Sequence, residues 1–247
     1  MQVTRLAIFA LFGLVSGLTE AESYGKFIGD VQTQWLDDGR RMKLITSLTY
    51  LDPQGERWVA REGSIVDGAS IPQFAWSLIG GPFEGKYRKA SVIHDVACVE
   101  KRRPWELVHE TFYQGMRASG VSELTAKIMY AAVYHFGPRW VTQYELKKVP
   151  RQAVDEAVSR VKAQADIDAE VQVSVTKEYT AKPPAAAPGT TPKEVAVTDL
   201  KVTVVPPAGA LKQSDLADLN AKIEKQAMTL KEIRDHRPAP PMNLRIQ

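Results

Sequence analysis

A histidine–aspartate pair, His94-Asp95, is the combination in this sequence best suited to acid–base chemistry. An imidazole titrates near neutral pH, so His94 could act as a general base if it faces a cleft. On a helix, Asp95 points about 100° away from His94. It therefore cannot orient that ring, but it could bind a cation or the backbone amides of a loop. Alternatively, His94 is a hydrogen-bonded core histidine and Asp95 a structural acceptor.

Three further side chains bear on the chemistry of this pair. Cys98 follows His94 by four residues and therefore lies on the same helical face. It could be a nucleophile, a metal ligand or a packing residue. His109 could approach His94 if their two helices pack antiparallel. Zinc coordination by the two histidines is then an alternative, although their spacing matches no specific zinc signature. His135 lies near a predicted helix end, where a surface role is expected.

A polar loop precedes the pair. In the run Asp67-Gly68-Ala69-Ser70-Ile71-Pro72, an aspartate before glycine and a serine three residues later can hold a tight turn, or line a site beside His94. Ser70 lacks the strand–turn–helix elbow of a hydrolase nucleophile. The expected binding residues are Asp67, Ser70, Tyr87 and His109.

Short strands and then helices must position these residues. Alternating segments Phe27–Trp35, Met42–Tyr50 and Glu56–Ala60 predict an antiparallel meander of about three or four strands. Helical periodicity follows, so residues 23–165 predict an α+β domain with a cluster of about three or four helices. The predicted helices are Tyr87–Val99, Pro104–Ala118, Ser122–Phe136 and Arg151–Ala165.

The remaining sequence changes character. In residues 166–210, Asp166–Thr176 and Glu194–Val205 could form a small hairpin or be disordered, and they flank a Pro/Ala-rich linker, Lys182–Pro192. Residues 211–236 predict a short coiled-coil helix that self-associates or docks. Its seam residues are Leu216, Leu219, Ile223, Leu230 and Ile233. A disordered tail is expected at 237–247.

The N-terminus has the layout of a secretory signal peptide. Arg5 precedes the apolar run Leu6–Val15, and Thr19-Glu20-Ala21 offers a cleavage site, so residues 1–21 predict export to the periplasm or outside the cell. The alternative is a buried N-terminal helix. The single cysteine, Cys98, suits an oxidising compartment and excludes an internal disulfide.

The composition is that of an ordinary soluble protein. Of 247 residues, 44% are hydrophobic and 25% charged. Basic residues number 32 and acidic residues 29, giving a net charge of +3. This balance argues against nucleic acid as a partner, which needs a concentrated basic face.

The ordered set of motifs resembles the bacterial and phage family known as domain of unknown function 1353, over about Phe27 to Trp140. The positions that carry the resemblance are Asp67–Pro72, Trp76, Tyr87, Ala90, His94-Asp95, Phe112, Met116, Gly120-Val121, Met129-Tyr130, Ala132-Val133, Phe136-Gly137 and Trp140. Cys98 stands where the family tends to have an aromatic residue, and His109 where it tends to have an aspartate. The resemblance implies a fold but no reaction.

A weaker resemblance is to phospholipase A2 enzymes, which place His-Asp on a helix behind a glycine-rich loop. Gly80, Gly81, His94 and Asp95 match that arrangement loosely. The resemblance implies a histidine that activates water, an aspartate that helps bind calcium, and a facing carboxylate that orients the histidine. The facing aspartate and the cysteine framework are missing here.

These observations predict a His/Asp-dependent hydrolase acting on envelope lipid or peptidoglycan. His94 would be the general base and Asp95 a metal ligand or loop anchor, with calcium or zinc as the candidate ion. The alternative is a non-catalytic, envelope- or virion-associated binding or structural module. A solvent-reachable His94 ring with a carboxylate on its far nitrogen favours the enzyme, whereas a sealed ring favours the module.

Overall fold

The N-terminal part of the computed structural model consists of short antiparallel strands in two small sheets. The structure describes residues 24–68, 70, 83, 85–182, 194–207 and 211–237. One sheet has the order β1-β4-β5, formed by β1 (Lys26–Ile28), β4 (Leu48–Leu51) and β5 (Arg57–Ala60). The other has the order β2-β3-β6, formed by β2 (Thr33–Trp35), β3 (Met42–Leu44) and β6 (Ile65–Val66).

The first two predicted strands are each split between the two sheets. Gly29 has a φ of 89°, a left-handed conformation that interrupts the extended run between β1 and β2. A bend at residues 45–46 likewise separates β3 from β4. The prediction of about three or four strands therefore undercounted them, although antiparallel pairing and the strand-then-helix order of an α+β fold are confirmed.

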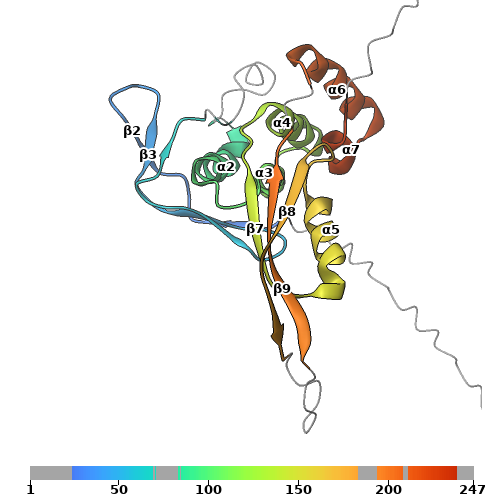
Figure 1. Cartoon of the computed structure of the whole chain (residues 1–247). Coiled ribbons are helices and arrows are strands. Elements are labelled where there is room, and N and C mark those ends of the chain that lie inside the picture. Colours follow the sequence, from blue (N-terminus) through green and yellow to red (C-terminus); the bar gives the residue numbers. More distant parts are fainter. Residues whose placement is uncertain are drawn as a thin grey trace, which may run out of the picture.

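Three helices form the centre of the molecule (Figure 1). They are α2 (Arg88–Glu100), preceded by the short helix η1 (Gly85–Tyr87), then α3 (Trp105–Ala118) and α4 (Glu123–Phe136). The Ser122 hydroxyl caps α4 by accepting a hydrogen bond from the Thr125 amide at 3.1 Å. A Cβ on Gly115 would lie 3.1 Å from the Ala90 Cβ, so α2 and α3 approach closely at this point.

A third sheet extends away from these helices as a long, narrow arm (Figure 1). Its order is β7-β9-β8, from β7 (Thr142–Pro150), β9 (Val195–Val205) and β8 (Glu170–Ala181). The hairpin considered for residues 166–205 is therefore present, whereas β7 was not predicted. The domain boundary expected at residue 165 separates two strands of one sheet.

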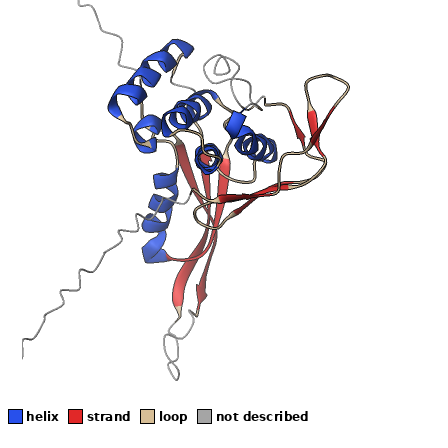
Figure 2. Ribbon diagram, turned by 180° about the vertical axis from the view of Figure 1, so that it is seen from behind, coloured by secondary structure: helices blue, strands red, loops and turns tan. Residues whose placement is uncertain are grey.

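A helix covers one face of this arm (Figure 2). This helix, α5 (Val154–Gln164), follows the short helix η2 (Arg151–Ala153) and matches the predicted helix at 151–165. Val161 packs in a small apolar cluster with Val202 and Val204. The arm therefore has its own core, apart from the one formed by the first strands, α2, α3 and α4.

The C-terminal segment is two helices, α6 (Gln213–Gln226) and α7 (Leu230–Arg234), not one coiled-coil helix. Ala227 adopts a left-handed φ of 49° and ends α6. The expected seam residues Leu216, Leu219, Ile223 and Ile233 are at most 2% exposed, and Leu230 packs beside them. Both helices lie against α4 of the same chain, so of the two outcomes expected for this segment the structure shows docking.

None of the helices within the described residues is long and apolar enough to cross a membrane. The predicted signal peptide at 1–21 lies outside the described residues.

Candidate functional site

Asp95 anchors the polar loop to α2. Its Oδ2 accepts hydrogen bonds from the backbone amides of Asp67 at 2.9 Å and Gly68 at 3.1 Å. Its Oδ1 accepts a hydrogen bond from the Ser70 hydroxyl at 2.7 Å. The carboxylate is 4% exposed, so these contacts satisfy a charge that burial would otherwise penalise. Of the two roles considered for Asp95, this arrangement matches the loop anchor rather than the metal ligand.

The His94 ring is sealed and contacted at both nitrogens. It is 1% exposed, its Nδ1 lies 3.1 Å from the Ser70 Oγ, and its Nε2 lies 2.8 Å from the His109 Nδ1. Phe112 stacks against it with ring centroids 4.7 Å apart. Burial lowers the pKa of His94 to about 3, so the imidazole is neutral at physiological pH.

His109, on α3, supplies the group that faces His94 from the neighbouring helix. The expected approach of the two histidines is therefore confirmed, with an imidazole in place of a facing carboxylate. The His109 Nε2 lies 3.1 Å from the Pro138 carbonyl oxygen, to which it donates a hydrogen bond. Burial, reinforced by repulsion from His94, holds the pKa of His109 well below its usual value.

Cys98 completes a cluster of three potential metal ligands. Its Sγ lies 3.6 Å from the His94 Nε2, and one ligand atom each from His94, Cys98 and His109 lie within 4.8 Å of one another. Burial raises the pKa of the Cys98 thiol, and Asp95 adds to that effect. A reactive nucleophile needs an accessible thiolate, and Cys98 is only 5% exposed.

The other predicted residues lie around this centre. The Asp67 carboxylate lies 3.4 Å from the Arg40 guanidinium, and the backbone amide of Asp67 donates to Asp95. Tyr87 ends η1 and packs in the main apolar core. The surface role expected for His135 is wrong: α7 covers it, and its Nε2 donates to the Ile233 carbonyl at 2.8 Å. Ala69, Ile71–Pro72, Trp76 and Gly80–Pro82 lie outside the described residues.

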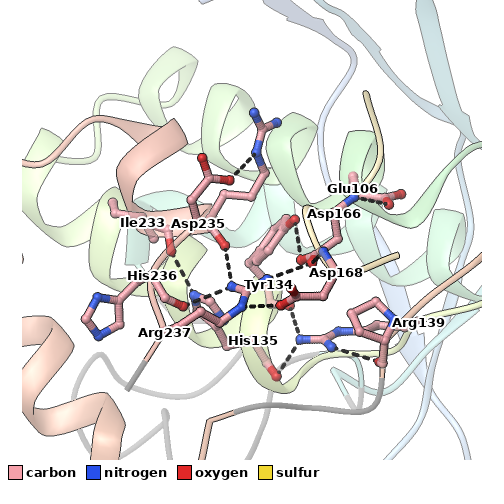
Figure 3. Close-up of polar contacts among 12 residues, drawn as sticks. Glu106, Tyr134, His135, Arg139, Asp166, Asp168, Ile233, Asp235, His236 and Arg237 are labelled. Atoms are coloured by element: carbon pink, nitrogen blue, oxygen red, sulfur yellow. Dashed lines mark hydrogen bonds and ion pairs between the residues drawn. The ribbon is translucent and has the colours of Figure 1, made fainter. Parts of the chain in front are cut away.

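Sequence reasoning missed a second buried polar cluster, which joins the C-terminus to α3 and α4 (Figure 3). The Asp166 carboxylate accepts hydrogen bonds from the Tyr134 hydroxyl at 2.9 Å and the Arg237 guanidinium at 2.7 Å. Its backbone amide donates to Glu106, whose pKa burial raises to about 7. Asp166 and Arg237 are 71 positions apart, so no local spacing could have revealed this contact.

Comparison with known proteins found two uncharacterized relatives and one family match. The chain is 47% identical over 125 residues to uncharacterized protein y4jT and 40% identical over 103 residues to uncharacterized protein y4iH, both from Sinorhizobium fredii (strain NBRC 101917 / NGR234). These matches cover 50% and 42% of this chain.

The same matches cover 37% and 43% of the two relatives, so the chain spans less than half the length of either one. No solved structure matches the chain. Residues 42–133, which contain His94, Asp95, Cys98 and His109, match the family described as Protein of unknown function (DUF1353), and the resemblance drawn from the sequence is confirmed.

Proposed function

We propose that this chain is a non-catalytic binding module of the cell envelope, exported by its N-terminal segment. In this proposal His94, Asp95 and Ser70 hold the 67–70 loop on the helices rather than turn over a substrate. The observation that carries it is the sealed His94 ring, which is 1% exposed and contacts side chains at both nitrogens.

The order of contacts at the site also supports the module over the hydrolase. In a serine hydrolase the carboxylate holds the far nitrogen of the histidine, and the histidine contacts the serine. Here Ser70 lies between Asp95 and His94, and the far nitrogen of His94 meets His109. Ser70 itself is 4% exposed, so its hydroxyl offers little access to an incoming acyl group.

The proposed contact surface is the β2–β3 hairpin, which stands away from the helices (Figure 1). Trp35 ends β2 and is 62% exposed, unusual for so large an apolar side chain. An indole carries an apolar body and one N–H donor, which suits the boundary between water and an envelope surface. Arg40 and Arg41 lie next to it, in the segment that joins β2 to β3.

Co-sedimentation of the purified full chain with peptidoglycan sacculi, and separately with phospholipid vesicles, tests this role. We expect binding to one of the two materials, and Trp35→Ala should lower the bound fraction at least about tenfold, as loss of an aromatic anchor does. Ile167→Ala is the matched control, because Ile167 is 67% exposed outside the hairpin. Binding to neither material, or equal binding by Trp35→Ala, would contradict the proposal.

A parallel screen addresses the hydrolase directly. Both materials are incubated with the protein, with and without calcium or zinc. A general base contributes roughly 10²–10⁴-fold to rate. If His94→Gln abolishes turnover without a change in melting temperature, the hydrolase replaces the binding module as the function of this chain. If His94 is structural, the same substitution lowers the melting temperature.

A further inference from the structure

The loop-anchoring role does not explain why His94, Cys98 and His109 are buried together. We propose that it binds a divalent transition-metal ion of the zinc type, through the His94 Nε2, the His109 Nδ1 and the Cys98 Sγ. These three atoms come from α2 and α3, and they lie within 4.8 Å of one another. The site would fasten the two central helices to each other.

A chain of buried contacts at this site has fewer protons than contacts. Four contacts run in series: Pro138 carbonyl to His109, His109 to His94, His94 to Ser70, and Ser70 to Asp95. Each neutral imidazole carries one proton and the hydroxyl carries one, while a carbonyl and a carboxylate carry none. Three protons are therefore available for four contacts.

One contact must then join two lone pairs. Because His109 donates to Pro138, its Nδ1 is an acceptor, so the His94 Nε2 donates to it and the His94 Nδ1 becomes an acceptor as well. The single Ser70 proton cannot serve both this nitrogen and Asp95. The Cys98 thiol adds one proton but contacts both the His94 Nε2 and Ser70, so the shortage remains.

A metal ion removes this shortage. If it bonds the His94 Nε2 and the His109 Nδ1, both remaining ring nitrogens carry protons. The His94 Nδ1 then donates to Ser70, Ser70 donates to Asp95, and His109 donates to Pro138. Histidine ligands in metal sites are held in this way by carbonyls and carboxylates through their second nitrogen. Every member of the chain is satisfied without an extra buried proton.

The charges also balance. The Cys98 thiol loses its proton to solvent as the sulfur–metal bond forms, so a dication meets one thiolate and the Asp95 carboxylate and the net charge is zero. Placing a proton on an imidazole instead would add a cation at a fully buried position, where burial without a paired charge is costly.

The ligand types and distances select the metal. Two nitrogens and a sulfur suit zinc and its neighbours, whereas calcium requires oxygen ligands. Tetrahedral bonds of about 2.0–2.1 Å to nitrogen and 2.3 Å to sulfur imply ligand separations of about 3.3 Å and 3.6 Å. The nitrogen–sulfur distance is 3.6 Å, and the 2.8 Å between the two nitrogens must open by about half an ångström.

The test is metal binding by the full chain after chelator treatment. Zinc is titrated against a competing chromophoric chelator, and cobalt(II) is used as a spectroscopic probe of the same site. We expect one zinc per chain, a thiolate-to-cobalt charge-transfer band, and zinc affinity at least tenfold weaker in Cys98→Ser. Ser70→Ala removes a hydrogen-bond partner of both His94 and Asp95 but no metal ligand, and should weaken zinc affinity by roughly 10–100-fold.

His135→Gln is the matched control, since His135 is a buried histidine on α4 that contacts Ile233 and not this cluster. It should bind zinc like the unmodified chain. No bound zinc, absence of the thiolate band, or equal affinity in Cys98→Ser would overturn the proposal. The cobalt spectrum of the unmodified chain decides the matter even if a substituted chain fails to fold.

Discussion

Replacing Asp95 by asparagine tests the proton count directly. In the metal-free protein, the asparagine oxygen can still accept the Asp67 and Gly68 amides, while its NH₂ group donates to Ser70. Ser70 is then free to donate to His94, and all four contacts of the chain carry a proton. The substitution therefore supplies the missing proton without burying a charge.

The expected magnitude follows from these contacts. The hydrogen bonds from the two backbone amides now go to a neutral acceptor instead of a charged one, which costs about 1 kcal/mol each. Relief of the one contact that lacked a proton returns about 1–3 kcal/mol. Asp95→Asn should therefore change the free energy of unfolding by less than about 1 kcal/mol. Asp95→Ala leaves two buried amides without a partner, at about 1–3 kcal/mol each, and gains the same relief at Ser70, so it should lower that free energy by about 1–3 kcal/mol.

The assay is guanidinium unfolding followed by tryptophan fluorescence, with a chelator present throughout. Zinc should favour the unmodified chain over Asp95→Asn, because the metal-bound form needs the His94 Nδ1 to donate to Ser70 and Ser70 to donate to a carboxylate. Asp95→Asn should thus bind zinc more weakly than the unmodified chain. An asparagine variant as unstable as Asp95→Ala in chelator would refute the proton count.

Three further predictions concern the packing around the site. Phe112→Ala removes a ring that is 1% exposed and stacked on His94, and should lower the free energy of unfolding by about 3–5 kcal/mol in denaturant titrations; a change near zero would show that the ring is not packed as described. Burial raises the folded-state pKa of Glu106 from 4.5 to about 7, so the stability it contributes is full below pH 4.5 and falls by about 3 kcal/mol as pH rises through 7. Glu106→Gln should flatten this part of a pH–stability profile. An unchanged slope would show that another titrating group causes the pH dependence. Leu219→Ala should destabilise by about 2–5 kcal/mol with a melting temperature independent of protein concentration, because Leu219 is buried against the same chain; a concentration-dependent melting temperature would restore self-association through α6.

The helices were predictable because their signals are local. Apolar periodicity and end signals such as Ser122 and Gly137 lie within a few residues of the structure that they determine. The N-terminal strands were harder to predict, since each has only two to four residues and pairing decides which sheet receives it. β7 was missed because it also depends on pairing with a distant strand: its partner β9 begins about 50 residues later in the chain.

The sequence by itself determined which chemical groups the site contains. The loop around Ser70, the pair His94-Asp95, the thiol one turn later and the facing His109 were all identified from motif, helical spacing and helix order. Because these groups lie on one loop and two consecutive helices, their proximity could be expected if the two helices packed antiparallel.

Only the tertiary structure decided what those groups can do. Whether His94 is a base or a sealed ring depends on burial by Phe112 and on contact with His109, and both residues come from another helix. The tail likewise packs on α4 of its own chain, because apolar spacing specifies a buried face but not what buries it. The roles depend on long-range packing, which residue types and spacing do not encode locally.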